Sequence, residues 1–219
     1  MISIVHSSMS IASIRKDYQM RSLSEHEVST DPFIQFTQWW DEAVQSEILE
    51  VNAMTLSTIK PDGRPSARIV LLKGFDQQGF VFYTNYESDK GKQLQQYPYA
   101  SLVFFWKELE RQVRIEGCCT RTSDQESSDY FRSRPLGSRL GAWASPQSRV
   151  IPNRELLQQN LEELTARYPE DDIPRPPHWG GFRLVPDRIE FWQGRSNRLH
   201  DRILYEKSEA SWRISRLAP

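Results

Sequence analysis

Residues that build metal sites and disulfide frameworks are scarce in this sequence. Its 219 residues include only 2 cysteines and 4 histidines. Cys118 and Cys119 are adjacent, which suits neither a disulfide framework nor a zinc site, and the histidines are scattered. We therefore predict that the protein holds no metal ion and that it occupies a reducing compartment, the cytoplasm.

Long apolar runs and an excess of charge of one sign are also missing. No segment approaches the length of a membrane-spanning helix, and the first residues lack the apolar stretch and processing site of a signal peptide. The formal net charge is −1, so the chain has no overall field that would attract nucleic acid or a membrane surface. Neither partner is predicted.

The residues that are present indicate a folded globule. Hydrophobic residues make up 38% of the chain and aromatic residues 11%, which is more than a disordered chain carries. Residues 1–30 are rich in serine and mixed charges without a sustained apolar period, so we predict a flexible N-terminal arm or lid. Residues 31–219 are long enough for a single domain with a substantial core.

Apolar periodicity predicts a mainly antiparallel β fold with flanking helices. Alternating segments separated by turn residues predict strands at 53–59, 66–75, 80–85, 100–106, 112–120, 181–185, 188–193, 202–205 and 212–215. Such a meander is typical of a barrel or a sandwich. Helices are predicted from Asp31, at 88–97, from Ser123 and at 153–168. Their expected buried stripes are Phe33, Phe36, Trp40 and Val44 in the first and Leu156, Leu157, Leu161 and Leu164 in the last.

The stretch from Arg188 to Arg202 has more polar chemistry than strand packing requires. Ile189 and Phe191 are expected on one strand face, with Glu190 and Trp192 on the other. If the chain is extended again after residues 194–197, then Arg198, His200 and Arg202 share one side. That surface suits an anionic ligand, although a solvated strand face has the same pattern.

This stretch carries a resemblance to a known family. Ile189-Glu190-Phe191-Trp192-Gln193, followed after four residues by Arg198-Leu199-His200-Asp201-Arg202, closely resembles the signature of the pyridoxamine 5'-phosphate oxidase family. The resemblance implies a split β-barrel, an antiparallel Greek-key barrel that binds FMN at the interface of a homodimer. It also implies oxidation of pyridoxamine or pyridoxine 5'-phosphate to pyridoxal 5'-phosphate, with O2 as acceptor and H2O2 as by-product.

Further segments resemble the family's flavin contacts. The segment Arg68-Ile69-Val70-Leu71-Leu72-Lys73 matches a strand that lies along FMN, and a bend is needed if both of its cations are to reach ligands. Asp89 departs from the family pattern, which has a cation there, and we expect its carboxylate to face solvent. The remaining flavin contacts implied by the resemblance are Tyr83, Thr84, Lys90, Gln112, Gln147, Ser148, Trp192 and Arg202.

The resemblance also implies residues that bind the substrate. Arg198 and His200 would hold and polarise its reacting end, as the catalytic pair, and Arg15 and Tyr18 would close over it. Its phosphate would contact Lys73, Tyr130, Arg134 and Ser138.

Two other functions remain open on the sequence. A split-barrel flavin reductase would share the fold and the cofactor, and so would a non-catalytic carrier of FMN or pyridoxal phosphate. The segment Arg198-Leu199-His200 argues against both, because neither function needs a substrate clamp.

Overall fold

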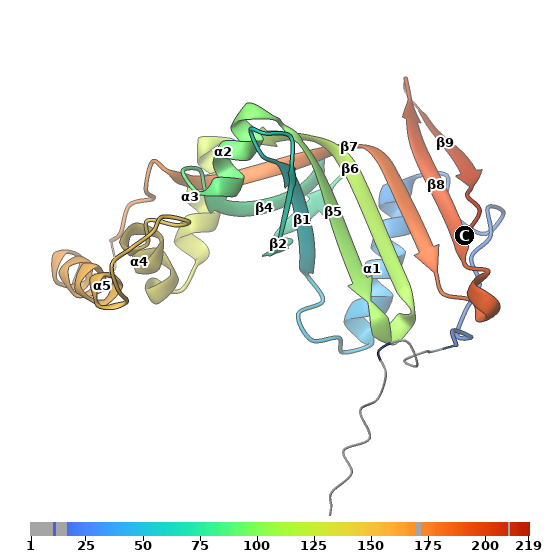
Figure 1. Ribbon diagram of the computed structural model, residues 1–219, viewed down its shortest axis with the longest axis horizontal. Coiled ribbons are helices and arrows are strands. Elements are labelled where there is room, and N and C mark those ends of the chain that lie inside the picture. Colours follow the sequence, from blue (N-terminus) through green and yellow to red (C-terminus); the bar gives the residue numbers. More distant parts are fainter. Residues whose placement is uncertain (1–10, 12–16, 170–171, 210) are drawn as a thin grey trace, which may run out of the picture.

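One long strand, β7 (Trp179–Gln193), organises the sheet of this protein. The computed structural model describes residues 11, 17–169, 172–209 and 211–219. Along one edge, β7 pairs with β6 (Arg111–Arg121). Along its other edge, the first half of β7 pairs with β4 (Gly79–Asn85) and the second half with β8 (Asp201–Ser208). A single strand therefore belongs to two groups of strands that diverge from each other (Figure 1).

Within the described residues, nine strands form one antiparallel sheet in the order β2-β1-β5-β6-β7-β4-β3, with β8 and β9 branching from β7. The other strands are β1 (Ala53–Ile59), β2 (Pro65–Leu71), β3 (Gly74–Asp76), β5 (Tyr99–Trp106) and β9 (Ser211–Arg216). Side chains alternate as expected, with Val113, Ile115, Ile189 and Phe191 fully buried. The predicted fold class, an antiparallel split barrel with flanking helices, is confirmed.

The core lies between the sheet and helix α1 (Pro32–Gln45). Asp31 caps this helix by accepting the Phe33 N–H at 2.7 Å. Its buried face carries Phe33, Phe36, Trp39 and Ala43. The predicted inclusion of Val44 is wrong, because this side chain is 48% exposed. Trp39 and Ala43 occupy the inner positions instead, since they follow Phe36 at helical spacing.

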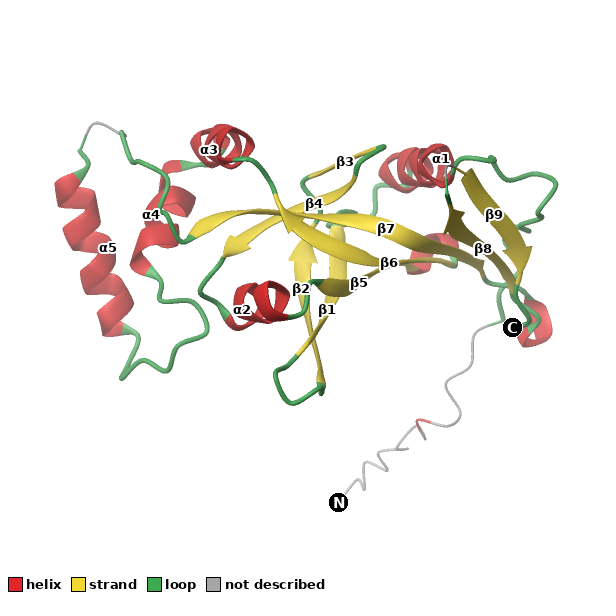
Figure 2. Cartoon of the chain, turned by 90° about the horizontal axis from the view of Figure 1, so that it is seen from above, coloured by secondary structure: helices red, strands yellow, loops and turns green. Residues whose placement is uncertain are grey.

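The other helices lie around the sheet, and two of them extend away from it. They are α2 (Asp89–Gln96), α3 (Asp124–Ser133), α4 (Leu136–Ala144) and α5 (Glu155–Arg167), with short 3-10 turns at Lys107–Leu109 and Ser196–Arg198. Figure 2 shows α4 and α5 beyond one end of the sheet, with β8 and β9 at the other. The expectation that α5 buries a leucine stripe is wrong, because this helix has no buried residue. It packs against α4 rather than across the sheet, so its leucines are only partly covered.

Two predicted strand boundaries need correction. Residues 66–75 do not form one strand, because β2 ends at Leu71 and β3 begins at Gly74. Leu72 enters the core and Lys73 is exposed, which is the predicted bend. Conversely, 181–185 and 188–193 are parts of β7, and the register shift at Glu116 and Gly117 of β6 lets the ladder continue past the interruption.

The described part of the N-terminal arm, residues 17–30, lies against the sheet. The Gln19 and Met20 N–H groups donate to Glu110 Oε2 at 3.0 and 3.2 Å. Leu23 is buried, and its N–H donates to Asp201. Residues 17–30 are thus anchored by the side chains of Glu110, in the turn before β6, and of Asp201 in β8. The predicted mobility of the arm stays a prediction.

Phe36 should be the most sensitive position of the core. Its ring is fully buried, with ring centroids of Phe75, Phe80 and Phe104 at 4.8, 4.9 and 5.4 Å. We expect Phe36→Ala to lower the free energy of unfolding by about 3–5 kcal/mol, measured by urea denaturation, because it leaves a cavity. Ile34→Ala, on the exposed face of α1, should change it by less than about 0.5 kcal/mol. Equal effects of the two substitutions would contradict this description of the core.

Candidate functional site

A cleft of about 460 Å³ opens where β2, β4, α3 and α4 meet at the start of β7. Residues 69–71 of the edge strand β2 line one side of the cleft. The Ile69 side chain there is 65% exposed. The full lining is Ile69, Val70, Leu71, Lys73, Tyr83, Thr84, Asn85, Lys90, Tyr130, Arg134, Pro135, Ser138, Gln147 and Trp179. It contains three cations, and no carboxylate side chain is among these residues.

Stacked aromatic rings form one wall of the cleft. The Tyr83 ring centroid lies 4.0 Å from that of Tyr130 and 5.5 Å from that of Trp179, and all three rings are nearly parallel. Burial raises the pKa of Tyr83 to about 12, so its hydroxyl stays neutral and can donate a hydrogen bond. The guanidinium carbon of Arg134 stands 4.6 Å from the Trp179 centroid. This contact fixes the direction of the cation.

Arg134 has an unmet hydrogen-bonding requirement. Its Nη1 is buried and has no hydrogen-bond partner in the described part of the protein. Burial also lowers the pKa of Arg134, because no carboxylate offsets the loss of hydration. A buried donor without a partner costs about 1–3 kcal/mol or more, so such groups are usually satisfied by a ligand or water. The cleft is therefore suited to an anion that accepts from Arg134.

A second polar group lies where α2 begins. Gln147 Oε1 accepts from Lys90 Nζ at 3.0 Å and from Thr84 Oγ1 at 3.2 Å. Burial lowers the pKa of Lys90, and the nearby Arg68 guanidinium lowers it further. Asp89 is exposed, as expected, but it still acts electrostatically on both cations. Arg68 and Lys90 together give this side of the cleft a positive potential.

Most of the residues predicted from the first two-thirds of the sequence converge on this cleft. Arg68 is an exception, because it donates to Thr58 and Ser66 outside the lining, and so is Leu72, whose side chain lies in the core. Tyr18 and Gln112 are exceptions as well, because they lie near the other end of β7. Ser148 follows Gln147 in an exposed turn outside the lining. Sequence reasoning missed Asn85, Pro135 and Trp179. For Trp179 the only local signal in the sequence was the Gly180-Gly181 pair that follows it, since paired glycines indicate close packing, and a Cβ there would collide with Tyr86 or Thr122.

Arg198 and His200 lie elsewhere, in a turn cluster with Tyr18 and Trp192. The His200 ring centroid is 4.7 Å from that of Trp192 and 6.0 Å from that of Tyr18. The Tyr18 ring stands perpendicular to Trp192 at 5.8 Å. Gly194 makes this possible, because a Cβ there would lie 2.7 Å from the Tyr18 ring. Arg15 lies outside the described residues.

The chain between β7 and β8 is folded back rather than extended. Asn197 and Arg198 have φ values of 55° and 62°, and β8 begins only at Asp201. The predicted alignment of Arg198, His200 and Arg202 on one strand face is therefore wrong. Instead the turn leaves Arg198 exposed and brings His200 back toward Arg195.

The turn also fixes the proton position on His200. The Arg195 backbone N–H donates to His200 Nδ1 at 3.0 Å, so Nδ1 is the acceptor and the neutral ring carries its proton on Nε2. Burial first, and the Arg198 guanidinium second, lower the pKa of His200, against an opposing effect of Asp201. At neutral pH His200 is thus a hydrogen-bond donor through Nε2.

Three predicted flavin contacts form a row beside this cluster. Gln112 of β6 is directly opposite Trp192 of β7, which is opposite Arg202 of β8. Directly opposed residues project from the same face of an antiparallel sheet. Phe105 of β5 extends the row, and its side chain is 55% exposed. The face is therefore a partly apolar, accessible surface.

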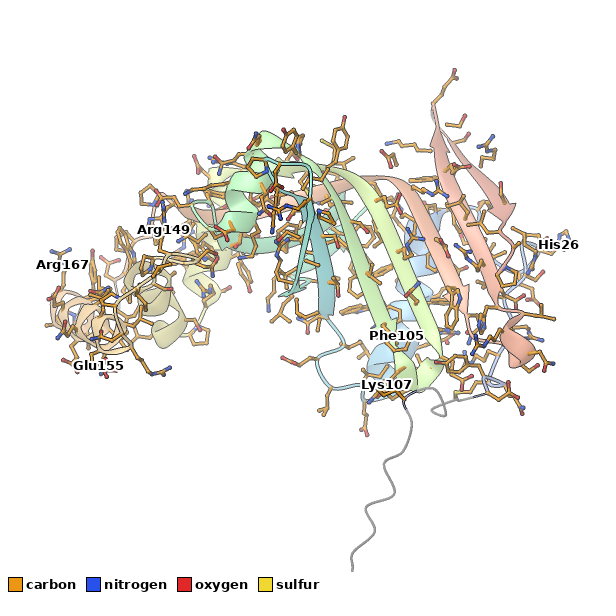
Figure 3. The ribbon with its side chains drawn as sticks, viewed as in Figure 1. His26, Phe105, Lys107, Arg149, Glu155 and Arg167 are labelled. Carbon is orange, nitrogen blue, oxygen red and sulfur yellow. The ribbon has the colours of Figure 1, made fainter. Side chains whose placement is uncertain are left out.

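The cleft and the turn cluster lie at opposite ends of β7. Trp179 belongs to the first and Trp192 to the second, and at roughly 3.3 Å per residue about 40 Å of strand separates them. Figure 3 shows Arg149, next to Ser148, at the end that carries α4 and α5, whereas Phe105 lies at the far end of β5. One chain does not bring the two groups of predicted residues together.

The lowered pKa and the tautomer of His200 predict that the stability of the turn depends on pH. Because its folded-state pKa is depressed, the unfolded chain binds the proton more readily, so stability from the turn should fall as the pH drops through about 6.5. In ¹⁵N-detected NMR we expect His200 Nδ1 to be unprotonated at pH 7.5 and the ring to titrate below 6.5, with exposed His26 observed in the same spectrum. A protonated Nδ1 at pH 7.5 would contradict the assignment.

Comparison with known proteins supports one family throughout the chain. Residues 40–168 match the sequence profile of the pyridoxamine 5'-phosphate oxidase family, and residues 179–219 match a pyridoxine 5'-phosphate oxidase C-terminal dimerisation region. The pyridoxine/pyridoxamine 5'-phosphate oxidase of Gloeothece citriformis is 58% identical over 211 residues, covering 96% of this chain and 99% of that protein. The Paraburkholderia xenovorans protein of the same name is 58% identical over 212 residues, covering 96% of this chain and 99% of that protein.

Solved structures agree with this assignment. PhzG from Burkholderia lata, in complex with tetrahydrophenazine-1-carboxylic acid, has a TM-score of 0.86 at 30% identity and covers 92% of this chain and 100% of its own. A pyridoxamine 5'-phosphate oxidase-related, FMN-binding protein from Nostoc punctiforme has a TM-score of 0.68 at 21% identity. The match covers 88% of this chain and 100% of that protein, which shares the fold. This chain belongs to the pyridoxine/pyridoxamine 5'-phosphate oxidase family of FMN-dependent oxidoreductases.

Proposed function

We propose that this protein oxidises pyridoxamine 5'-phosphate or pyridoxine 5'-phosphate to pyridoxal 5'-phosphate, with O2 as acceptor and H2O2 as by-product. The observation that carries the proposal is the buried Nη1 of Arg134, which has no partner among the described residues, in a cleft whose lining has three cations and no carboxylate. Such a site recognises a phosphate ester by charge and by directed hydrogen bonds. The free cysteines fit a reducing compartment, which the proposal takes to be the cytoplasm.

The residues of the cleft fit FMN as well as a substrate phosphate. Lys90, Thr84 and Gln147 form one polar group, with Arg68 beside it, and suit the flavin phosphate. The exposed edge of β2 at Ile69–Leu71 could border the flavin ring. When bound, FMN supplies the redox chemistry, taking a hydride equivalent from the substrate and passing the electrons to O2.

The residues around Arg134 would bind the substrate's phosphate. Arg134 is oriented by its stacking on Trp179, and Tyr130 by its stacking on Tyr83. Lys73, at the bend after β2, and Ser138, in the first turn of α4, complete the grip. These four side chains offer donors from three separate elements, so they fix both the position and the direction of the phosphate.

We infer that a second copy of the chain completes the site. Arg198 and His200 lie about 40 Å of strand away from the cleft on the same chain, so the partner's copies would supply them. The matched dimerisation region, residues 179–219, contains the turn cluster, β8 and β9. The row through Phe105, Gln112, Trp192 and Arg202 offers a partly apolar face for the contact, with FMN between the subunits.

The turn cluster would act on the substrate's reacting end. His200 presents an Nε2–H donor, and the exposed Arg198 presents a guanidinium beside it. Together they can hold and polarise a polar substituent of the ring without removing a proton. Tyr18, packed on Gly194, would cover the bound substrate, and Arg15 is proposed to act with it.

The two alternative functions, flavin reductase and non-catalytic carrier, would give different experimental results. A flavin reductase would need a nicotinamide cofactor to reduce the flavin, and a carrier would bind FMN or pyridoxal phosphate without forming peroxide. The three cations that line the cleft favour a doubly charged phosphate ester over a singly charged carboxylate such as the tetrahydrophenazine-1-carboxylic acid bound by the Burkholderia protein.

Anaerobic reduction tests the proposal. The FMN-loaded protein is mixed with pyridoxamine 5'-phosphate without oxygen, and the flavin absorption is followed. We expect bleaching that returns with air, together with an aldehyde product. Arg134→Ala should raise KM at least tenfold, equivalent to roughly 1.4 kcal/mol of lost binding, and affect kcat less. Retained flavin colour with pyridoxamine phosphate, but bleaching with a nicotinamide cofactor, would favour the reductase instead.

A further inference from the structure

We propose that Glu190 is a positioning residue that orients Arg202 and neutralises its charge, so that Arg202 offers FMN directed hydrogen bonds without adding net positive charge. This rests on the proposed function, in which Arg202 contacts the flavin. Glu190 lies within the signature segment of β7, where the proposed function assigns roles to Trp192 and Arg202 but none to this carboxylate.

The Glu190 carboxylate is buried and fully engaged. It is 3% exposed, and it accepts from Arg202 Nε at 2.8 Å and Nη2 at 3.1 Å in a bidentate pair. From the other side it accepts from Arg114 Nη1 at 3.0 Å. Arg114 is directly opposite Glu190 on β6, and Arg202 is diagonal to it on β8. Three strands therefore meet at one carboxylate.

Arg202 keeps donors that these contacts do not use. Its third hydrogen bond runs from Nη1 to the Ala218 carbonyl at 2.9 Å, and the Leu217 N–H donates back to the Arg202 carbonyl at 2.9 Å. A guanidinium has five N–H donors, so among the described residues one remains on Nη1 and one on Nη2. Held at three points, Arg202 can present this pair of donors in one direction with little loss of side-chain entropy on binding.

The charges around Arg202 cancel. Arg114 also forms an ion pair with Glu116, at 2.7 Å. The series of ion pairs through Glu116, Arg114, Glu190 and Arg202 therefore contains two negative and two positive side chains. A positive charge beside a flavin stabilises its reduced form, which carries more negative charge than the oxidised form. With Glu190 ionised, the ring would meet hydrogen-bond donors but no net cation.

Stability alone is a weak reason for such a pair. Removing two ions from water costs about as much as their attraction returns, and buried pairs are often no more stabilising than apolar residues. The Glu190 carboxylate is buried, but its bidentate partner Arg202 remains 26% exposed, opposite Trp192 in the row. A role in positioning this accessible guanidinium accounts for the arrangement.

Two substitutions separate geometry from charge. Glu190→Gln keeps the shape and loses the charge, whereas Glu190→Asp keeps the charge and loses reach. For Glu190→Gln we expect the FMN dissociation constant, from quenching of flavin fluorescence, to rise about tenfold, and the midpoint potential of the bound flavin to shift to more positive values. Glu190→Asp should weaken FMN binding several-fold and leave the potential near that of the unmodified protein.

Glu206→Gln is the matched control. Glu206 also lies on the β7–β8 pair and also bonds arginine, with Arg213 at 2.6 Å, but it is outside the row. It should change neither the FMN affinity nor the potential. Melting temperatures of all variants without FMN establish that each one folds.

A double-mutant cycle with Arg202→Met tests whether Glu190 affects FMN binding through Arg202. If Glu190 acts through Arg202, adding Glu190→Gln to Arg202→Met should change the FMN dissociation constant less than about twofold. An undiminished effect in that background, or unchanged affinity and potential in Glu190→Gln alone, would overturn the proposal. Failure of the proposed function is separate, because it would appear as unmodified protein that binds FMN but is not bleached by pyridoxamine 5'-phosphate.

Discussion

The continuity of β7 is the constraint on which the rest of the structure depends. Its ladder with β6 runs from Phe182 to Gln193 with one register shift, and its first residues, from Trp179, pair with β4, so the strand acts as a rigid spacer. The cleft is built at its first end by α3, α4 and β4, and the turn cluster at its second end by β8 and the arm. Because a paired strand cannot fold back on itself, only a second copy of the chain could bring the two groups together.

The chemistry at the two ends is complementary. The cleft provides fixed cations, and among the described residues Nη1 of Arg134 has no hydrogen-bond acceptor, so the cleft is suited to anionic groups. The turn cluster and the row instead provide neutral or neutralised donors, because His200 is held as its Nε2–H tautomer and Arg202 is balanced by Glu190. Phosphates would thus be recognised by charge, and the reacting rings by hydrogen bonds.

The sequence predicted the parts of this site whose signals are local. Strand alternation and serine caps before α2 and α3 are short-range patterns, and both are present. The motifs also identified the lining of the cleft, apart from residues such as Trp179. Non-local facts were not accessible: the α5 leucines depend on what covers that helix, and the joining of two predicted strands into β7 depends on the shift at Gly117.

The turn after β7 shows why pattern alone failed at the reacting end. The residues Asn197 and Arg198 adopt left-handed backbone conformations that sequence preference does not anticipate for arginine. The turn is held by the local hydrogen bond from Arg195 to His200 and by a long-range contact, the packing of Tyr18 on Gly194.

Mixing two impaired variants, assayed at a substrate concentration far below the KM of Arg134→Ala so that each alone is nearly inactive, tests the shared site most directly. Arg134→Ala removes a cleft residue and Arg198→Ala a turn residue, so a hybrid dimer would hold one intact site and one doubly altered site. After subunit exchange at equal amounts, we predict recovery of about a quarter of the unmodified activity, since half of the dimers would be hybrids with one working site of two. No recovery, with hybrid dimers demonstrated by native mass spectrometry, would contradict a site built from both subunits.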